Sequence, residues 1–420
     1  MRKTLGRKTL GGAVSAAMLA AGYLATSGLT AVPAAAQASA SKVSGDVVKI
    51  GVLTDMSGPY VDINGPGSVE AVRMAVEDFG GTVLGKPIEI VSADHQNKAD
   101  VGANVARSWY DQDGVDVVTN MANSAVALAV QRLATDKKRL SINTAAATSD
   151  MTGKACSPNG FSWTYNTQAL ASGTGNALVE QGGKSWFFLT SDYAFGHALE
   201  RDTSAAVKAA GGTVVGAVRH PLNNADFSSF LLQAQGSGAQ VIGLANAGTD
   251  TINTIKQASE FGIVQAGQKL AGLLVFLTDI HSLGLKTAQG LVITTAFYWD
   301  MNEETRAWNK RFQERHGKPA TMLQAGDYTS TLHYLAAVKA AGTDEASAVA
   351  AKFKEMPVND FMGKGYKIAE NGRVMRDMHL VQVKSPEESK GPWDYYKVLA
   401  TIPAEKAYGK VADSGCPLVK

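Results

Sequence analysis

Lys49-Ile50-Gly51-Val52-Leu53-Thr54-Asp55-Met56-Ser57-Gly58-Pro59 is the stretch that decides the fold. Its apolar first half is typical of a buried strand, and Ser, Gly and Pro end that strand in a turn. A helical pattern follows at Gly67–Phe79, after which strand-like runs and helix-like segments alternate along the chain. This alternation predicts an α/β fold with mostly parallel sheets.

The first half of the pattern forms one doubly wound unit. Its further strands are predicted at Ile88–Ala93, Val115–Thr119 and Leu140–Asn143, with helices at Lys98–Gln112 and Ser124–Asp136. A second unit follows the segment Phe161–Thr167. Its predicted strands are Trp186–Thr190, Thr213–Val218, Val241–Ala245, Leu273–Phe276 and Leu291–Thr295, and its helices are Ala194–Ala210, Phe227–Gln235 and Asp250–Phe261.

After Thr295 the pattern changes to successive helices, which are predicted at Glu303–His316, Leu323–Ala341 and Glu345–Lys354. We expect these helices to return to the first unit. The last strands, His379–Val383 and Tyr395–Ile402, would then close the second unit, so that the chain crosses between the two units three times.

The N-terminus predicts export. Arg2, Lys3, Arg7 and Lys8 precede a weakly apolar stretch that ends in Ala35-Ala36-Gln37-Ala38, a pattern typical of a signal peptide cleaved after Ala38. The stretch is too short and too interrupted for a membrane span of about 20 apolar residues. We therefore expect residues 1–38 to be removed and the mature protein to reside in the periplasm.

Removal of the signal changes the charge of the protein. The chain has 40 basic and 38 acidic residues, but four of the basic ones lie in the signal, so the mature chain is slightly acidic. A nucleic-acid-binding domain needs clustered Lys and Arg, which this composition does not favour. The remaining length of about 380 residues suits two domains.

The two cysteines, Cys156 and Cys416, fit a disulfide in an oxidising compartment, and the alternative is two unpaired buried thiols. A disulfide would tie the C-terminus to the segment that leaves the first unit. No metal site is indicated by two cysteines, and no cofactor is expected.

Catalytic patterns are absent from the sequence. Gly183-Lys184-Ser185 ends like a phosphate-binding loop, but Leu178 stands where its first glycine is needed. Gly65-Pro66-Gly67 begins like a dinucleotide fingerprint that Glu70 then breaks. The nucleophile-elbow and zinc-protease motifs are also missing. The protein is therefore not expected to be an enzyme.

Three turns stand out because each follows a predicted strand. They are Asp55–Tyr60, Asn120–Ser124 and Asn143–Asp150. The carboxyl ends of parallel strands are where open α/β sheets bind ligands. The helix that begins near Ser124 directs its positive end to the same place, which suits a carboxylate.

The sequence resembles the Leu/Ile/Val-type periplasmic solute-binding proteins of ABC importers. The resemblance rests on Lys49–Pro59, on the Ala145–Thr148 turn and on Ser191-Asp192-Tyr193-Ala194-Phe195-Gly196, and it extends over essentially the whole mature chain. It implies the type I periplasmic binding protein fold, in which two doubly wound parallel-sheet lobes are joined by a three-strand hinge and close on a ligand. The predicted first lobe comprises residues 46–165 and 297–373, the second comprises 166–296 and 374–410, and 411–420 form a tail tied by the disulfide.

The resemblance also implies a binding site. The first lobe would hold a ligand carboxylate through the turns at Asn123-Ser124 and Ala145–Thr148. In the amino-acid binders the second lobe supplies a Tyr and a Glu for the ammonium. Here Ala247 occupies the Tyr position, and Leu274-Val275-Phe276-Leu277 offers no acid before Asp279. An ammonium would be buried without a counter-charge, which is costly.

Apolar and aromatic residues replace those acids, which favours an aromatic carboxylate. We expect the ligand to contact a set of residues drawn from both lobes, namely Tyr60, Asn123, Ser124, Ala145, Ala146, Ala147, Thr148, Tyr193, Phe195, Asn246, Ala247 and Phe276. The protein is predicted to be a monomer that delivers a small organic carboxylate to the membrane permease of an ABC importer. The alternatives are a receptor for branched-chain or other amino acids, amides or urea, and a sensor subunit that presents its ligand to a membrane receptor.

Overall fold

Strand β1 (Val48–Thr54) lies inside a six-stranded sheet in the computed structural model, which describes residues 42–420. The strand order is β2-β3-β1-β4-β5-β6, and every pair is parallel except β2 with β3. The other strands are β2 (Thr82–Val83), β3 (Lys86–Asp94), β4 (Val117–Asn120), β5 (Leu140–Asn143) and β6 (Gly160–Ser162). The predicted parallel sheet of the first unit is confirmed.

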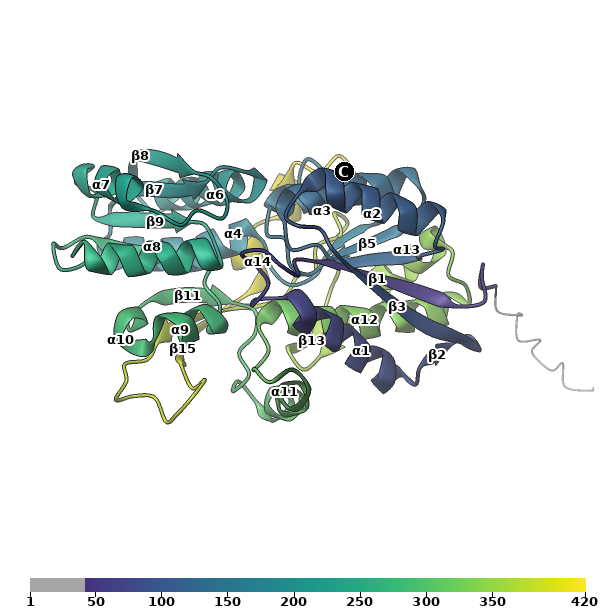
Figure 1. The fold of residues 1–420 in the computed structure, drawn as a ribbon. Coiled ribbons are helices and arrows are strands. Elements are labelled where there is room, and N and C mark those ends of the chain that lie inside the picture. Colours follow the sequence, from purple (N-terminus) through teal and green to yellow (C-terminus); the bar gives the residue numbers. More distant parts are fainter. Residues whose placement is uncertain (1–41) are drawn as a thin grey trace, which may run out of the picture. The chain divides into compact units, whose positions relative to one another are not determined.

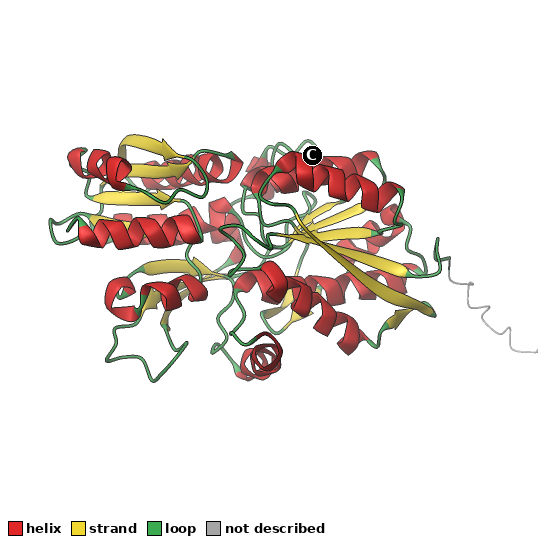
Figure 2. Ribbon diagram, viewed as in Figure 1, coloured by secondary structure: helices red, strands yellow, loops and turns green. Residues whose placement is uncertain are grey.

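Side chains of β1 alternate between two apolar layers, as the pleat of a strand requires. Val48, Ile50 and Val52 join a core with α1 (Gly65–Phe79), α12 (Met322–Ala341) and α13 (Ala346–Glu355). Leu53 instead packs in a second core with α2 (Ala99–Asp111) and α3 (Ser124–Asp136). Helices therefore cover both faces of this sheet (Figure 2). We call this part the first lobe.

A second parallel sheet has the order β10-β9-β7-β8. Its strands are β7 (Ser185–Ser191), β8 (Thr213–His220), β9 (Val241–Ala245) and β10 (Lys269–Gly272). The helices of this part are α4 (Thr167–Leu170) and α5 (Asn176–Glu180), which a π-helical turn at Ala171–Gly175 joins, and α6 (Ala194–Ala209), α7 (Ser228–Gly236) and α8 (Thr249–Glu260). Figure 1 shows β7–β9 with α6–α8 grouped apart from β1, β3 and β5 with α2 and α3.

A third sheet is antiparallel. It consists of β11 (Val292–Thr295), β14 (Met378–Val383) and β15 (Tyr396–Ile402), in the order β11-β14-β15. The short helices α9 (Leu277–Leu283) and α10 (Leu285–Ala288) precede it in the chain. The last two strands pair antiparallel with β11 and share an apolar core with β7 and β9, whereas their assignment to the second lobe stays a prediction.

The chain passes between the lobes three times. It leaves the first lobe after β6, returns after β11 to α11 (Glu303–His316), and leaves again after Arg373, which pairs with Ser162 of β6. The remaining elements are β12 (Val358–Asp360), β13 (Gly363–Tyr366) and α14 (Ala404–Tyr408). This topology is the predicted one of two lobes and three crossovers, whereas the exact residue boundaries of the lobes stay a prediction.

One strand prediction is wrong. Leu273–Phe276 is not a strand, because β10 ends at Gly272, where it is paired with Leu244 of β9. The four residues after Gly272 form the buried connection to α9, and none of them is more than 3% exposed. A short apolar run shows that a segment is buried but not that it is extended. Here Leu273, Leu274 and Phe276 pack in the apolar core that includes both lobes, and Val275 packs with residues of α9.

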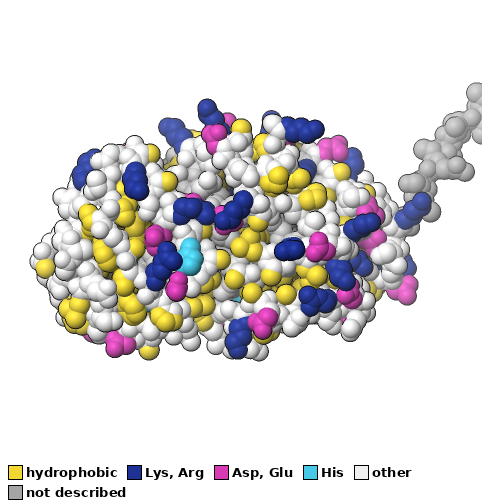
Figure 3. Space-filling view, turned by 90° about the horizontal axis from the view of Figure 1, so that it is seen from above, with side chains coloured by type: hydrophobic (Ala, Val, Ile, Leu, Met, Phe, Trp, Pro, Cys, Tyr) yellow, Lys and Arg dark blue, Asp and Glu magenta, His cyan; other side chains and the backbone are white. Residues whose placement is uncertain are grey.

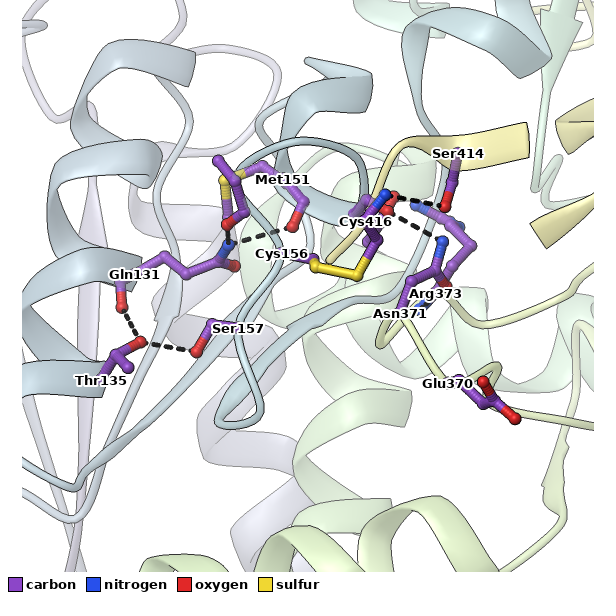
Figure 4. Close-up of a disulfide and its surroundings, with 12 residues drawn as sticks. Gln131, Thr135, Met151, Cys156, Ser157, Glu370, Asn371, Arg373, Ser414 and Cys416 are labelled. Atoms are coloured by element: carbon purple, nitrogen blue, oxygen red, sulfur yellow. Dashed lines mark hydrogen bonds between the residues drawn. A yellow bond between two sulfur atoms is a disulfide. The ribbon is translucent and has the colours of Figure 1, made fainter. Parts of the chain in front are cut away.

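The predicted disulfide is present between Cys156 and Cys416, whose Cα atoms are 5.6 Å apart (Figure 4). Close to it, Gln131 of α3 donates hydrogen bonds to the carbonyls of Met151 and Ala155, at 3.0 and 2.6 Å. The disulfide therefore attaches the C-terminal segment to a loop that α3 already fixes.

Acidic and basic side chains lie close together on the surface (Figure 3). Arg311 pairs with Asp78 at 2.7 Å, and Arg315 pairs with Glu77 at 2.7 Å. Within residues 42–420, no helix has the length and apolar character that a membrane span requires. The predicted signal peptide, residues 1–38, lies outside the described residues.

Candidate functional site

The first wall of the site is the turn between β4 and α3. Asn120 and Met121 have φ angles of 75° and 58°, so the chain turns sharply where β4 ends. Asn123 then caps α3, since its Oδ1 accepts from the backbone N–H groups of Ala125 and Val126, at 2.9 and 3.3 Å. Its side-chain oxygen is thereby used within the protein. Ser124, the first residue of α3, lines the site.

The second wall is the turn after β5. Asn143 holds this turn through Ala146, because its Oδ1 accepts from the Ala146 N–H at 2.8 Å and its Nδ2 donates to the Ala146 carbonyl at 2.7 Å. The two walls meet where the Thr148 N–H donates to Ser124 Oγ at 3.3 Å. Thr148 itself accepts from the Asp150 N–H through its hydroxyl.

Several backbone donors of these walls have no partner among the described residues, and the N–H groups of Ser124 and Ala147 are two of them. Both residues line the same cavity. The Ser124 N–H also belongs to the first turn of a 13-residue helix, where the helix dipole favours negative charge. Together these features suit an anionic acceptor such as a carboxylate.

Asp327 of α12 forms hydrogen bonds to both walls. Its carboxylate accepts from the Thr144 hydroxyl on one side and from Asn120 Nδ2, at 2.9 Å, on the other. The side chain is fully buried. Burial raises the pKa of the Asp327 carboxyl to about 7, against hydrogen bonds from Thr144, Ser68 and Asn120 that lower it. Sequence reasoning gave no role to this residue.

The second lobe provides the facing wall. Tyr193 and Phe195 come from the β7–α6 connection, Ala247 from the β9–α8 connection, and Leu274 from the segment after β10. The hydroxyls of Tyr60 and Tyr193 lie 2.6 Å apart, in a hydrogen bond that joins the two lobes. Burial raises the pKa of both phenols well above the ordinary value, so both remain protonated near neutral pH.

A second contact between the lobes lies next to these tyrosines. The Pro59 carbonyl accepts from the backbone N–H of Thr249 at 3.2 Å. Gly248 has a φ of 60°, and a Cβ there would stand 2.4 Å from the Pro59 oxygen. Only glycine therefore allows this approach. The described conformation is thus a closed one.

The closed lobes leave a cavity of about 10 Å³, room for about one water molecule. Its walls carry no Asp, Glu, Lys or Arg side chain; the lining residues are Tyr60, Ile63, Ala122, Ser124, Ala145, Ala147, Tyr165, Tyr193, Phe195, Ala247, Leu274 and Leu323. The polar side-chain groups at its walls are therefore hydroxyls.

The nearby acids are turned away from the cavity. Asp55 accepts from the N–H groups of Gly58 and Tyr60, at 2.7 and 2.8 Å. Asp250 accepts from the N–H groups of Asn223 and Asn224, at 3.0 and 2.9 Å. Asp279, the acid that an amino-acid receptor would have had to use, accepts from the Phe276 N–H at 2.9 Å at the start of α9.

Seven of the predicted ligand contacts lie at the cavity, namely Tyr60, Ser124, Ala145, Ala147, Tyr193, Phe195 and Ala247. Five do not line it. Asn123, Ala146 and Thr148 stabilise the turns through the hydrogen bonds described above. Asn246 is buried within the second lobe, bonded to Thr251, His220 and Thr254, and Phe276 precedes α9 in the apolar core.

Sequence reasoning missed five lining residues, which are Ile63, Ala122, Tyr165, Leu274 and Leu323. Ala122 and Leu274 lie inside segments already singled out, so a focus on hydroxyls and rings passed over them. Tyr165 follows β6 at the same carboxyl edge of the sheet as the other turns, a signal that could have found it. Leu323 comes from α12, and no local pattern connects it with the cleft.

Comparison with known proteins agrees with this architecture. The family model described as "Periplasmic binding protein" matches residues 47–392. A crystal structure of a periplasmic binding protein from Burkholderia mallei is 53% identical, with a TM-score of 0.88 over 89% of this chain and 100% of that one. A branched chain amino acid ABC transporter periplasmic ligand-binding protein from Burkholderia xenovorans LB400 is 44% identical, with a TM-score of 0.79 over the same shares.

More distant similarities extend the same picture. A curated relative, Leu/Ile/Val-binding protein homolog 6 from Brucella melitensis, is 27% identical over 299 residues, 69% of this chain and 73% of the relative. A solute binding protein of an ABC transporter from R. palustris, solved with benzoate, is 20% identical with a TM-score of 0.78, covers 89% of this chain and 100% of its own, and shows the fold alone.

The chain belongs to the periplasmic binding protein family. It is a substrate-binding protein of the ABC transporter type and not an enzyme, as the sequence predicted. Proteins of this family bind small ligands and work with transporter permeases in the membrane.

Proposed function

We propose that this protein captures a small organic carboxylate that carries no ammonium group, and that the body of this ligand is aromatic. The observation that carries the proposal is the contrast between the cavity walls. The first lobe offers the unpaired N–H groups of Ser124 and Ala147, and the walls around them hold hydroxyls and rings but no acid.

A carboxylate can accept hydrogen bonds from both donors. These bonds compensate for the hydrogen bonds to water that the carboxylate loses when it enters the cavity. An amino acid would bring its ammonium into the same space, where no acid of the lining can balance it. Tyr60, Tyr165, Tyr193 and Phe195 would enclose the body of the ligand.

Binding requires that the lobes open. Because the closed cavity holds about one water molecule, a ring can enter only if Tyr60 and Tyr193 separate. Separation of the lobes about the three crossovers is the hinge motion expected of this architecture. We therefore propose that the ligand bridges the lobes in place of part of the Tyr60–Tyr193 contact.

We further propose that residues 1–38 are cleaved as a signal peptide and that the mature protein acts as a periplasmic monomer. The lobes would comprise residues 46–165 with 297–373, and 166–296 with 374–410. Transport is proposed over sensing, because the family works with transporter permeases.

A branched-chain amino acid is the second candidate ligand, since the 44% identical protein from Burkholderia xenovorans carries that name. Isothermal titration of the purified mature protein with benzoate, 3-phenylpropanoate, phenylalanine and leucine separates the two. We expect saturable binding of an aromatic carboxylate and much weaker binding of leucine and phenylalanine. Tight leucine binding with no response to either aromatic acid would refute the proposal.

A further inference from the structure

Tyr165 stands out among the cavity residues because its hydroxyl is used inside the cavity wall. It donates to the Ala145 carbonyl at 2.7 Å, and both residues line the cavity. Burial raises the pKa of the Tyr165 phenol, so it remains a hydrogen-bond donor in the whole neutral range. The hydroxyl thus occupies one of the two lone pairs of a strong acceptor of the first-lobe wall and offers in its place a phenolic oxygen, which is a weaker acceptor than an amide carbonyl.

The other carbonyls of this turn are used differently. The Ala146 carbonyl accepts from Asn143 Nδ2, and the Ala147 carbonyl accepts from the Thr167 N–H at 2.8 Å. Both bonds come from the scaffold behind the turn, from residues that do not line the cavity. In this turn the Ala145 carbonyl is therefore the acceptor whose availability to a ligand depends on a cavity side chain.

Arg373 fixes the position of Tyr165. It donates to the Tyr165 carbonyl at 2.6 Å and to Ser162 Oγ at 3.0 Å. Arg373 begins the third crossover, and the other two residues stand at the first, so these hydrogen bonds connect the two crossovers. Arg373 is 1% exposed, and Tyr165 is 2% exposed. The backbone of Tyr165 is therefore fixed at the hinge, and its side chain is buried in the described closed conformation.

We propose that Tyr165 is the specificity-determining residue that makes the cavity reject amines, by occupying the Ala145 carbonyl that an ammonium group would need. The inference rests on the proposed function and names the residue responsible for it. An ammonium group needs several acceptors when it leaves water. With the carbonyl covered and no acid in the lining, it finds hydroxyl oxygens alone among the side chains.

The test compares ligands that differ in the amine alone. The probes are 3-phenylpropanoate with phenylalanine, and 4-methylpentanoate with leucine. Their dissociation constants are measured by titration calorimetry for the wild type, for Tyr165→Phe and for Tyr193→Phe. Tyr193→Phe is the matched control, because it removes a phenol from the same cavity without uncovering the Ala145 carbonyl.

We expect the wild type to prefer the amine-free acid of a pair by at least about 100-fold, and Tyr165→Phe to reduce this preference by about tenfold or more, the size of one hydrogen bond to a charged group. Tyr193→Phe should weaken both members of a pair alike. Thermal unfolding of each variant reports whether it is folded. Tyr165→Leu, which also uncovers the carbonyl, replaces Tyr165→Phe if that variant does not fold.

The outcomes separate the two proposals. If the wild type prefers the amino acid, or binds neither acid, the proposed function fails. If the wild type prefers the amine-free acid but Tyr165→Phe keeps the same preference, the proposed function stands and the role of Tyr165 is refuted. An equal loss of preference in Tyr165→Phe and Tyr193→Phe also refutes it, because the effect would then not depend on the Ala145 carbonyl.

Discussion

Replacing Asp327 with asparagine tests whether this buried carboxyl carries a proton in the folded protein. Its pKa is raised from 3.8 to about 7 by burial. Between about pH 4 and pH 7 the Asp327 carboxyl is protonated in the folded protein but ionised in the unfolded chain. The contribution of this carboxyl to the unfolding free energy is therefore complete below pH 4 and is lost as the pH rises through 7. A difference of about 3 pH units corresponds to about 4 kcal/mol of unfolding free energy.

The asparagine variant removes this pH dependence and adds a constant cost. The amide does not titrate, and it has one acceptor oxygen where the carboxyl has two, so either Thr144 or Asn120 loses its partner. Leaving one buried donor unpaired costs about 1–3 kcal/mol at any pH. We expect Asp327→Asn to be less stable than the wild type at pH 4.5, and this deficit to vanish or reverse by pH 8.

Urea unfolding followed by circular dichroism at pH 4.5 and pH 8 measures the effect. Asp116, Asp250 and Asp279 also have a raised pKa, and His95 has a lowered one, but these groups are present in both proteins and cancel in the comparison. If the stability of both proteins changes between the two pH values by the same amount, within about 1 kcal/mol, Asp327 is ionised in the folded state and the reasoning is wrong.

Asp279→Asn is a matched control for function. Its carboxyl is fully buried with a pKa raised to about 7, but it contacts the start of α9 and not the two turns. Both variants should flatten the pH dependence of stability. Only Asp327→Asn should weaken the binding of an aromatic carboxylate, since Thr144 and Asn120 belong to the cavity turns.

Three further predictions test other parts of the molecule. Ser124→Ala removes the hydroxyl that accepts from the Thr148 N–H and should weaken carboxylate binding about tenfold in titration calorimetry; an unchanged affinity would place the carboxylate elsewhere. Replacing Cys156 and Cys416, which are 260 residues apart, with serine should lower the unfolding free energy by about 2–4 kcal/mol in urea, whereas equal midpoints would show that the tie contributes nothing. Mass spectrometry of the exported protein should find an N-terminus at Ser39, and a different start would contradict cleavage after Ala38.

The alternation of strands and helices was predictable because burial on both faces of a parallel sheet leaves continuous apolar runs such as Val241–Ala245. Turn residues after each run then marked where the helices begin, as at Ser124. The same signal failed at Leu273–Phe276, where an equally apolar segment is buried in the core as a connection and the strand itself lies earlier, at Lys269–Gly272. The local sequence pattern indicates which residues are buried, whereas hydrogen bonding to β9 determines which of these buried residues form a strand.

The cavity was predictable as a place but not residue by residue. The turns at Asn120–Ser124 and Ala145–Thr148 lie where the strand ends required, yet polar side chains that were predicted to contact the ligand make hydrogen bonds within the protein. Asn123 caps α3 and Asn246 bonds to Thr251. A side chain that can bind a ligand can equally satisfy an unpaired backbone group next to it, and sequence does not distinguish the two uses.

The residues that the sequence analysis missed contact residues that are far from them in the sequence or belong to other segments of the fold. Asp327 lies 207 residues from Asn120 and 183 from Thr144, and only the return of α12 to the first lobe brings them together. Tyr165 reaches the Ala145 carbonyl because the first crossover begins beside that turn, and Arg373 of the third crossover holds it there. The turns that line the cavity are therefore local in the sequence, whereas the residues that hold those turns come from distant parts of the chain, Asp327 from α12 and Tyr165 and Arg373 from the first and third crossovers.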